Sequence, residues 1–221
     1  MIIHEMKQYS PEWWAIRKGI PTASRARDLI TAKTGALSTS SAPYINELIA
    51  DRLGLGEPPI EPTEWMIRGS ELEPEARRFF TFATELQVRE VGFITNDEGS
   101  AGCSPDSLIP AYGETLFDEI TADQWQVPPN VFHAGLEIKC PMTKTHIGYL
   151  LNGGLADYYK QQVHFSLALT GLDVWYWMSY HPELEPLIVP VKRDEYTAMV
   201  EKAIAVFIVE QKKAMTKLGI S

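Results

Sequence analysis

Cysteine is scarce in this sequence, which contains only Cys103 and Cys140 among its 221 residues. Two thiols cannot form a disulfide framework, and they are too few for the four thiolates of an ordinary iron–sulfur cluster. His133, His146 and His164 lack the spacing of a zinc site. We therefore expect a protein of the reducing cytosol in which both cysteines serve as small core residues.

Long apolar runs are absent as well. No segment reaches the roughly 20 residues that a membrane-spanning helix requires, and the first residues do not resemble a secretory signal peptide. Hydrophobic residues nevertheless make up 45% of the chain, which is enough for a buried core. We expect no membrane association and a single domain over residues 1–221.

Positive charge is in short supply: 20 Lys and Arg residues face 29 Asp and Glu residues, which gives a net charge of −9. This balance argues against a protein that coats nucleic acid. It leaves room for an enzyme that grips a few phosphates, because affinity depends on local basic patches. One such patch lies between residues 13 and 36, where five basic residues accompany a single acid, Asp28.

Apolar spacing and turn signals predict an α/β fold with a mixed central β-sheet flanked by helices. We expect helices at 12–18, 22–30, 41–53, 63–86, 143–151, 157–170 and 195–218, and strands at 1–4, 87–95, 101–103, 106–109, 136–140, 173–180 and 187–191. Thr22 and Ser41 are expected helix caps, and strand 1–4 is expected at a sheet edge. Pro74 predicts a kink or two abutting helices, and residues 110–134 form a long irregular insertion.

The most informative stretch is Gly135-Leu136-Glu137-Ile138-Lys139-Cys140-Pro141. Because strand residues alternate between faces, Glu137 and Lys139 share one face while the apolar residues take the other. Upstream, Ser104-Pro105-Asp106 adds a carboxylate at the start of another expected strand. A carboxylate and an ammonium on one face of a core strand, with a second carboxylate nearby, are typical of metal-dependent nucleases.

Hard divalent cations take oxygen ligands, and Mg²⁺ is usually held by one or two carboxylates, waters and substrate phosphate. Asp106, Glu137 and the carbonyl of Ile138 could supply three such oxygens. Lys139 could position the attacking water or stabilise developing negative charge. Glu73, on the helix expected at 63–86, could add a carboxylate, and Gln162 could orient the water.

Each of these patterns also has an ordinary structural explanation. A Glu-x-Lys triplet arises by chance and can be a surface charge pair, and Ser-Pro-Asp is as often a turn as a ligand. Neighbouring glutamates on the long helix are most often a solvated face. The strand character around Glu137 favours the metal site.

These residues form part of a larger set of ordered blocks. The blocks are Trp13-x-x-x-Arg17-x-Gly19-x-x-Thr22-Ala23-Ser24, Gly69-x-x-x-Glu73-x-x-Ala76-Arg77, Cys103-Ser104-Pro105-Asp106, the Gly135–Pro141 stretch and Gln162-Val163-x-x-Ser166. Because these blocks occur in this order, the sequence resembles the lambda-type phage exonucleases. This group is also called the YqaJ-like viral recombinase family and belongs to the PD-(D/E)xK nucleases. The resemblance covers roughly residues 13–180.

The resemblance implies a restriction-endonuclease-like core and an alkaline-exonuclease type of activity. Such an enzyme digests one strand of linear double-stranded DNA from 5′ to 3′ with Mg²⁺, for which Mn²⁺ can substitute, and leaves 3′ single-stranded tails for phage-type homologous recombination. The expected partners are double-stranded DNA ends, two further copies in a homotrimer and a single-strand annealing protein. The expected compartment is the bacterial or phage-infected host cytosol.

The resemblance also implies roles for individual residues. It places metal binding on Asp106, Glu137 and Ile138, and catalysis on Lys139 together with Glu73 and Gln162. The sites that it adds are a 5′-phosphate pocket of Arg17, Ser24 and Ser104, and a strand-separating wedge at Met66. The insertion at about 110–134 is longer than the family's tight connection.

Two other functions remain open. The same core could cut internal phosphodiesters as a structure- or site-specific endonuclease. The chain could also be a non-catalytic subunit that binds DNA ends. The complete set of Asp106, Glu137 and Lys139 argues against the second possibility.

Overall fold

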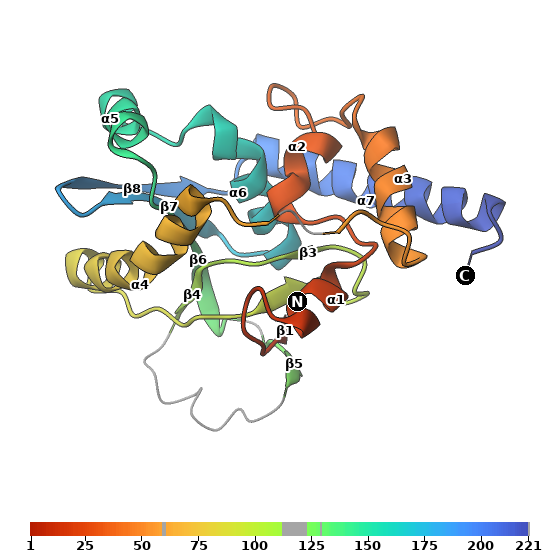
Figure 1. The fold of residues 1–221 in the computed structure, drawn as a ribbon, viewed down its shortest axis with the longest axis horizontal. Helices are drawn as coiled ribbons and strands as arrows, with labels where there is room; N and C mark the ends of the chain where they lie inside the picture. The colour runs from red at the N-terminus through yellow and green to blue at the C-terminus, as the bar shows by residue number, and fades with distance from the viewer. Residues whose placement is uncertain (59–60, 112–122, 129, 221) are drawn as a thin grey trace.

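The computed structural model describes residues 1–58, 61–111, 123–128 and 130–220, and within them the strands form two four-stranded sheets (Figure 1). The larger sheet has the order β4 (Ser107–Pro110), β6 (Phe132–Lys139), β7 (Val174–His181) and β8 (Leu184–Lys192). Only β6 and β7 are parallel, and the other pairs are antiparallel. The predicted mixed sheet is therefore confirmed.

The smaller sheet was not anticipated. It has the order β3 (Gly102–Cys103), β2 (Phe93–Thr95), β1 (Ile2–His4) and β5 (Gln124–Gln126), and every pair is antiparallel. The prediction that the N-terminal strand lies at a sheet edge is wrong, because β1 pairs with β2 on one side and β5 on the other. β5 belongs to the segment 110–134, which gave no clear strand pattern.

Helices cover the large sheet (Figure 1). In chain order they are α1 (Pro11–Arg17), the short 3₁₀ helix η1 (Ala23–Arg25), α2 (Ala26–Leu29), α3 (Ser41–Arg52), α4 (Glu64–Thr84), α5 (Thr143–Asn152), α6 (Asp157–Thr170) and α7 (Glu195–Lys217). The segment between the parallel strands β6 and β7 contains α5 and α6, which both contact β7, while α4 contacts β6. The long helix α7 packs on α6 and α3.

The core lies on both faces of the large sheet. On one face, Ala76 and Phe80 of α4 pack with Leu136 and Ile138 of β6, and all four side chains are buried. The other face packs against α6, whose Val163 and Phe165 are fully buried in the larger apolar cluster. β6 is thus covered on both sides, and its residues from Ala134 to Ile138 are all buried.

The N-terminal helices differ from the predicted ones. The single helix expected at 22–30 is divided into η1 and α2, and Thr22 makes no capping hydrogen bond. Thr22 is instead extended and bridges to Gly102, so its hydroxyl turns toward other partners. Ser41 is also not a cap, because Ser40 occupies that position without a side-chain capping bond.

Pro74 does not divide the long helix. The segment Glu64–Thr84 is one helix of 21 residues with Pro74 inside it, so the alternative of two abutting helices is wrong. A proline in a helix interior removes one backbone hydrogen bond. Burial of Ala76 and Phe80 against the large sheet stabilises this stretch and offsets that loss.

The strands around the predicted insertion also required correction. The strand expected at 87–95 is limited to β2, and the one expected at 136–140 begins four residues earlier, at Phe132, and ends at Lys139. The segment 110–134 is therefore not irregular throughout, because it includes β5 and the start of β6. Residues 112–122 and 129 of this predicted insertion lie outside the described residues.

In the described part of the chain, no helix combines the length and apolarity needed to cross a membrane.

Candidate active site

The pairing of β4 with β6 brings the two predicted carboxylates together. Ser107 pairs with Leu136, and the amide of Asp106 donates a hydrogen bond of 3.0 Å to the carbonyl of Leu136. The next step of this antiparallel register places Asp106 opposite Glu137. The buried Glu137 belongs to a central strand, while Asp106 is half-buried at the entry to β4.

Each carboxylate keeps one oxygen for a further partner. Oδ2 of Asp106 accepts a hydrogen bond of 2.5 Å from the amide of Ile138. Oε1 of Glu137 accepts two, from Nζ of Lys139 at 2.5 Å and from Nε2 of Gln162 at 2.6 Å. Among the described residues, none donates a hydrogen bond to Oδ1 of Asp106 or to Oε2 of Glu137. Two carboxylate oxygens therefore lack a hydrogen-bond donor in the described part of the chain.

The pKa values of Asp106 and Lys139 reflect the close approach of these charged side chains. Burial raises the pKa of Asp106 well above its ordinary value, and the negative charge of Glu137 raises it further. Burial alone would lower the pKa of Lys139, but Glu137 and Asp106 together raise it above the usual lysine range. Lys139 is therefore an ammonium that donates hydrogen bonds, held beside two carboxylates that repel each other.

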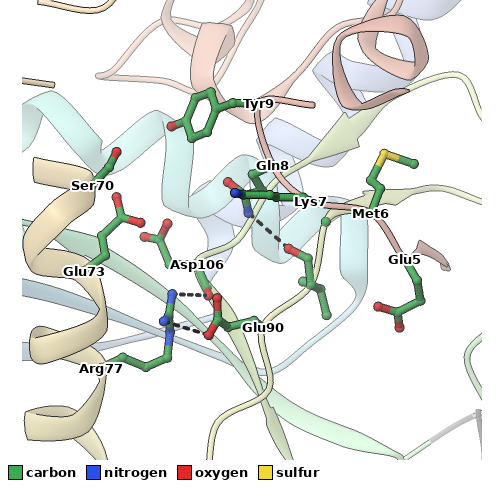
Figure 2. Close-up of a pocket in the computed structure, with 12 residues that line it drawn as sticks. Glu5, Met6, Lys7, Gln8, Tyr9, Ser70, Glu73, Arg77, Glu90 and Asp106 are labelled. Atoms are coloured by element: carbon green, nitrogen blue, oxygen red, sulfur yellow. Dashed lines mark hydrogen bonds and ion pairs between the residues drawn. The ribbon is translucent and has the colours of Figure 1, made fainter. Parts of the chain in front are cut away.

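Glu73 adds a third carboxylate from α4. Burial raises the pKa of Glu73, which Lys139 opposes. Glu73 and Asp106 line a cavity of about 260 Å³, and Figure 2 shows their carboxylates pointing toward the same space. Arg77, one helical turn further along α4, donates hydrogen bonds to the hydroxyl of Ser107 and the carbonyl of Asp106 at 3.0 and 3.4 Å. It also forms an ion pair of 2.9 Å with Glu90.

The donor set suits a hard cation with few protein ligands. Among the described residues, no group of three or more His, Cys, Asp or Glu side chains is arranged to hold a metal ion. Mg²⁺ does not require such a group, because one or two carboxylates, waters and substrate phosphates complete its shell. The two free carboxylate oxygens of Asp106 and Glu137, with their mutual repulsion, fit that kind of site.

The three residues predicted to bind a 5′-phosphate also lie together. Nη1 of Arg17 donates to the hydroxyl of Ser104 at 3.2 Å, and Nη2 donates to the hydroxyl of Ser24 at 3.0 Å. Thr22 joins them, with its hydroxyl 3.5 Å from Nη2 and 3.2 Å from the Ser24 hydroxyl. We call Arg17, Thr22, Ser24 and Ser104 the Arg17 pocket.

Trp13 holds the guanidinium in this position. The carbon of the guanidinium lies 4.0 Å from the centroid of the Trp13 ring, and Nε1 of Trp13 donates to Ser104 at 2.9 Å. Burial lowers the pKa of Arg17 to about 10, so the group stays charged at neutral pH. Arg17 therefore packs on Trp13 and donates hydrogen bonds to the serine hydroxyls at the same time.

Met66 lies at the start of α4, where 54% of its surface is exposed. It lines a groove of about 680 Å³ whose walls also include Glu73, Ile138 and Lys139. All ten predicted site residues thus fall into three adjoining regions. Asp106, Glu137, Ile138, Lys139, Gln162 and Glu73 surround the carboxylates, Arg17, Ser24 and Ser104 form the pocket, and Met66 lines the groove.

Four residues of these regions were not assigned by sequence reasoning. Trp13 precedes Arg17 by four positions, and this helical spacing is consistent with their contact. For Thr22 the sequence predicts only a helix cap, and for Arg77, which lies in one of the ordered blocks, it predicts no role. Tyr9 gave no signal, because it comes from the irregular segment between β1 and α1.

Comparison with known proteins identifies related chains. The family model for the YqaJ-like viral recombinase domain matches residues 12–173. The chain is similar to the alkaline exonuclease LHK-Exo from Laribacter hongkongensis, with 30% identity and a TM-score of 0.74 over 95% of this chain and 96% of that one. A structure of LHK-Exo in complex with dAMP matches equally well.

A more distant solved structure shares the fold. The phage-related exonuclease from Haemophilus somnus 129PT has 11% identity and a TM-score of 0.60, over 93% of this chain and 99% of that one. No curated protein sequence matches this chain.

Proposed function

We propose a function for this chain, which belongs to the YqaJ-like viral recombinase family and is accordingly an exodeoxyribonuclease with a restriction-endonuclease-like α/β fold. In this proposal, it digests one strand of linear double-stranded DNA from 5′ to 3′ with Mg²⁺. The product in this proposal is a duplex with 3′ single-stranded tails for phage-type homologous recombination. The observation that carries the proposal is the position of Asp106 opposite Glu137. Lys139 contacts Glu137, and Ser104 of the Arg17 pocket lies two residues before Asp106.

Asp106, Glu137 and the carbonyl of Ile138 would hold the metal ion. Mg²⁺, or Mn²⁺ in its place, lowers the pKa of a bound water and screens the charge of the phosphate when it is bound. The free oxygens Oδ1 and Oε2 are the groups that support this assignment.

Lys139, Gln162 and Glu73 would complete the catalytic set. Lys139 and Gln162 both donate to Oε1 of Glu137, so each is anchored beside the place where the phosphate would sit. The ammonium of Lys139 would then stabilise the negative charge that develops on the phosphate. Gln162 can donate a second amide hydrogen to an attacking water. Glu73, on α4, lines a cavity together with Asp106.

The Arg17 pocket would give the enzyme its polarity. A terminal phosphate carries more charge than an internal diester, and a guanidinium can hold it with paired hydrogen bonds. Ser104 links the pocket to the carboxylates, since only Pro105 separates it from Asp106. A 5′-phosphate held by Arg17, Ser24 and Ser104 would therefore set the next phosphodiester beside the metal-binding residues.

The wider organisation belongs to the same proposal. We place one nuclease domain on residues 1–221, with an insertion at about 110–134, and Met66 as the wedge between the strands. The functional unit would be a homotrimer that encloses DNA and works with a single-strand annealing protein in the cytosol of a bacterium or infected host. Exposure of Met66 beside the groove supports its assignment.

The decisive experiment compares DNA forms with and without metal. Purified protein is mixed with a 5′-phosphorylated linear duplex, labelled at either end of one strand, and with a covalently closed circle, in Mg²⁺ or EDTA. We expect mononucleotides from the 5′ end of the linear duplex, only in Mg²⁺, and no cleavage of the circle. Cleavage of the closed circle would establish the endonuclease alternative, and binding of ends without cleavage would establish the end-binding subunit.

Two substitutions tie this activity to the carboxylates. Asp106→Asn and Glu137→Gln keep the size of each side chain but remove the anion, so we expect cleavage to disappear while the protein still binds DNA ends. Glu201→Gln, an exposed acid on α7, is the matched control and should cleave normally. Near wild-type cleavage by either of the first two variants would show that the assigned site is wrong.

A further inference from the structure

The groove that adjoins the carboxylates is lined by exposed aromatic rings. Tyr9, Trp14 and Trp65 contribute three of its walls, and their exposed fractions are 59%, 38% and 60%. We call this the aromatic groove. Its polar end is formed by Lys139 and Glu73, so it opens directly onto the candidate catalytic residues.

The apolar residues at the start of α4 do not follow the pattern of a core helix. Trp65, Met66 and Ile67 are consecutive, and each has about half or more of its surface exposed. An amphipathic helix buries one face, so three successive exposed apolar residues are not explained by packing. Contiguous exposed apolar surface beside a polar site usually marks a binding surface.

The backbone at Tyr9 gives a second, independent sign of function. Tyr9 has a φ of 67°, in the left-handed region that residues other than glycine seldom adopt. Its ring lies 5.0 Å from the ring of Trp13 and 6.4 Å from that of Trp14. Figure 2 shows the hydroxyl of Tyr9 turned toward the side of the cavity that carries Ser70 and Glu73. Unfavourable backbone conformations of this kind cluster at ligand sites.

Trp13 connects the aromatic groove to the Arg17 pocket. One face of the Trp13 ring contacts the guanidinium of Arg17, and its indole nitrogen donates to Ser104. Tyr9 and Trp14 pack against the same ring, with Trp14 in an edge-on arrangement at 4.7 Å. The phosphate pocket, the aromatic rings and the carboxylates are therefore contiguous.

We propose that the aromatic groove is a stacking site for the unpaired bases of the strand being cut. This inference rests on the proposed function and deepens it. A strand with its 5′-phosphate in the Arg17 pocket and its next phosphodiester at Asp106 carries its bases past Tyr9, Trp14 and Trp65. Aromatic side chains stack on any base, so such a site captures frayed nucleotides without reading their sequence.

The chemistry of the groove favours bases over a protein partner. Two of its three charged groups, Lys139 and Glu73, are already assigned to the cleavage site; Glu71 is the third, and most of its remaining walls are rings and aliphatic surface. Such walls suit a planar base with its backbone directed toward the carboxylates. A second copy of the chain seated here would block the way to Lys139.

The test is a binding experiment without catalysis. A 5′-phosphorylated single-stranded oligonucleotide, and the same strand with abasic sites at its first two positions, are titrated in EDTA against the full-length protein, with fluorescence anisotropy as the readout. Wild type should bind the normal strand about tenfold more tightly than the abasic strand, as expected for loss of one or two stacking contacts. Trp65→Ala should bind both strands alike, because the ring and the base contribute through the same contact.

Two further variants keep the experiment interpretable. Trp65→Phe retains an aromatic face and should restore part of the difference between the strands. Phe82→Ala removes an exposed aromatic residue of the same helix that does not line the groove, with 83% of its surface exposed, and should behave as wild type. If Trp65→Ala still distinguishes the two strands tenfold, the stacking site is refuted.

Other outcomes separate this proposal from the exonuclease proposal. If the wild-type strands differ tenfold and Trp65→Ala removes the difference, the groove binds bases even if no cleavage follows in Mg²⁺. If wild type cleaves linear DNA but binds both strands equally, the exonuclease stands and the stacking site falls. A change of molecular mass in Trp65→Ala with no change in binding would assign the groove to contact between copies and overturn the proposal.

Discussion

The charge at Lys139 is the residue-scale feature on which the proposed chemistry depends. Its ammonium contacts Glu137 at 2.5 Å and lies 5.4 Å from the centroid of the Tyr159 ring. The stem is largely covered, with 27% of the side chain exposed, so the charge is held in one place before substrate arrives. A preorganised charge of this kind stabilises a transition state without reorganisation at the moment of reaction.

We predict that Lys139→Ala lowers the single-turnover rate on a 5′-phosphorylated linear duplex by at least about 100-fold, because one oriented donor to developing charge is lost. Lys139→Arg should not restore the rate, since a planar guanidinium cannot occupy the position of a compact ammonium. Lys213→Ala, on exposed α7 surface, is the control and should react normally. Unchanged chemistry in Lys139→Ala would remove this residue from the mechanism.

Arg17 illustrates how one side chain can have a structural contact and a functional one. The same guanidinium packs on Trp13 and donates to Ser24 and Ser104. The serine hydroxyls are weak partners for a buried cation, and among the described residues no carboxylate forms an ion pair with it. A charge that lacks an anion inside the protein is suited to one supplied by the substrate.

We therefore predict that wild type degrades 5′-phosphorylated ends faster than 5′-hydroxyl ends, and that Arg17→Ala removes most of this preference. Arg17→Lys should keep part of it, because the charge remains while the paired hydrogen bonds are lost. The ratio of initial rates on the two ends is measured for each variant, which cancels any change in overall stability. Equal wild-type rates on both ends would refute the pocket and the explanation of polarity.

At the scale of elements, β6 carries both the core and the site. Leu136 and Ile138 pack against α4, while Glu137 and Lys139 face Gln162 of α6 and Tyr159. Gly135 belongs to the same family block but has a packing role. A Cβ at this position would lie 2.4 Å from the ring of the fully buried Trp175, its partner on β7.

We predict that Gly135→Ala lowers the free energy of unfolding by roughly 1–3 kcal/mol, because the added methyl group overpacks the contact with Trp175. Gly148→Ala is the matched control. Gly148 lies inside α5 with open space around its Cα, so alanine there should stabilise the protein by roughly 0.5–1 kcal/mol. Urea titrations of both variants measure the two effects. A Gly135→Ala variant as stable as wild type would show that the close approach is not what requires glycine.

The sequence predicted β6 and its two faces because alternation of side chains is a local property of a strand. The same holds for α1, α6 and α7, whose apolar spacing lies within each helix. The central position of β1 could not be predicted, since it depends on pairing with β5, more than 100 residues away. The position of Tyr9 in the groove could not be predicted either, because a tyrosine with left-handed backbone in an irregular segment has no local sequence pattern.

The candidate site shows the same contrast between residues with a local sequence pattern and residues placed by long-range contacts. The ordered blocks predicted the set of site residues, and the pairing of β4 with β6 brings Asp106 and Glu137 together. Arg77 was left without a role, although it fixes the backbone of Asp106, because a hydrogen bond across 29 residues leaves no periodic pattern. Partners set by tertiary contacts were therefore accessible only through the structure.

For the whole molecule, the distribution of charge matters more than its sum. The chain has a net charge of −9, yet residues 13–36 contain five basic residues and one acid, and Arg27 and Lys33 in this segment are exposed. DNA binding requires local neutralisation of phosphates, and distant acidic surface reduces nonspecific retention. An acidic enzyme that must remain on one duplex through many cycles gains from enclosing it, because enclosure does not depend on strong attraction.

We accordingly predict a ring-shaped homotrimer, which multi-angle light scattering would report as about 75 kDa, three times the 24.9 kDa of one chain. Cyclic assembly with heterologous contacts closes into such a ring, and basic residues should then line its interior. Raising the salt concentration should weaken the initial capture of DNA, while the number of nucleotides removed per binding event should change much less, since a closed ring retains its substrate topologically. Processivity is measured on long linear duplexes with an excess of unlabelled competitor DNA added after the first turnover. A monomer of about 25 kDa that remained processive under these conditions would contradict the ring.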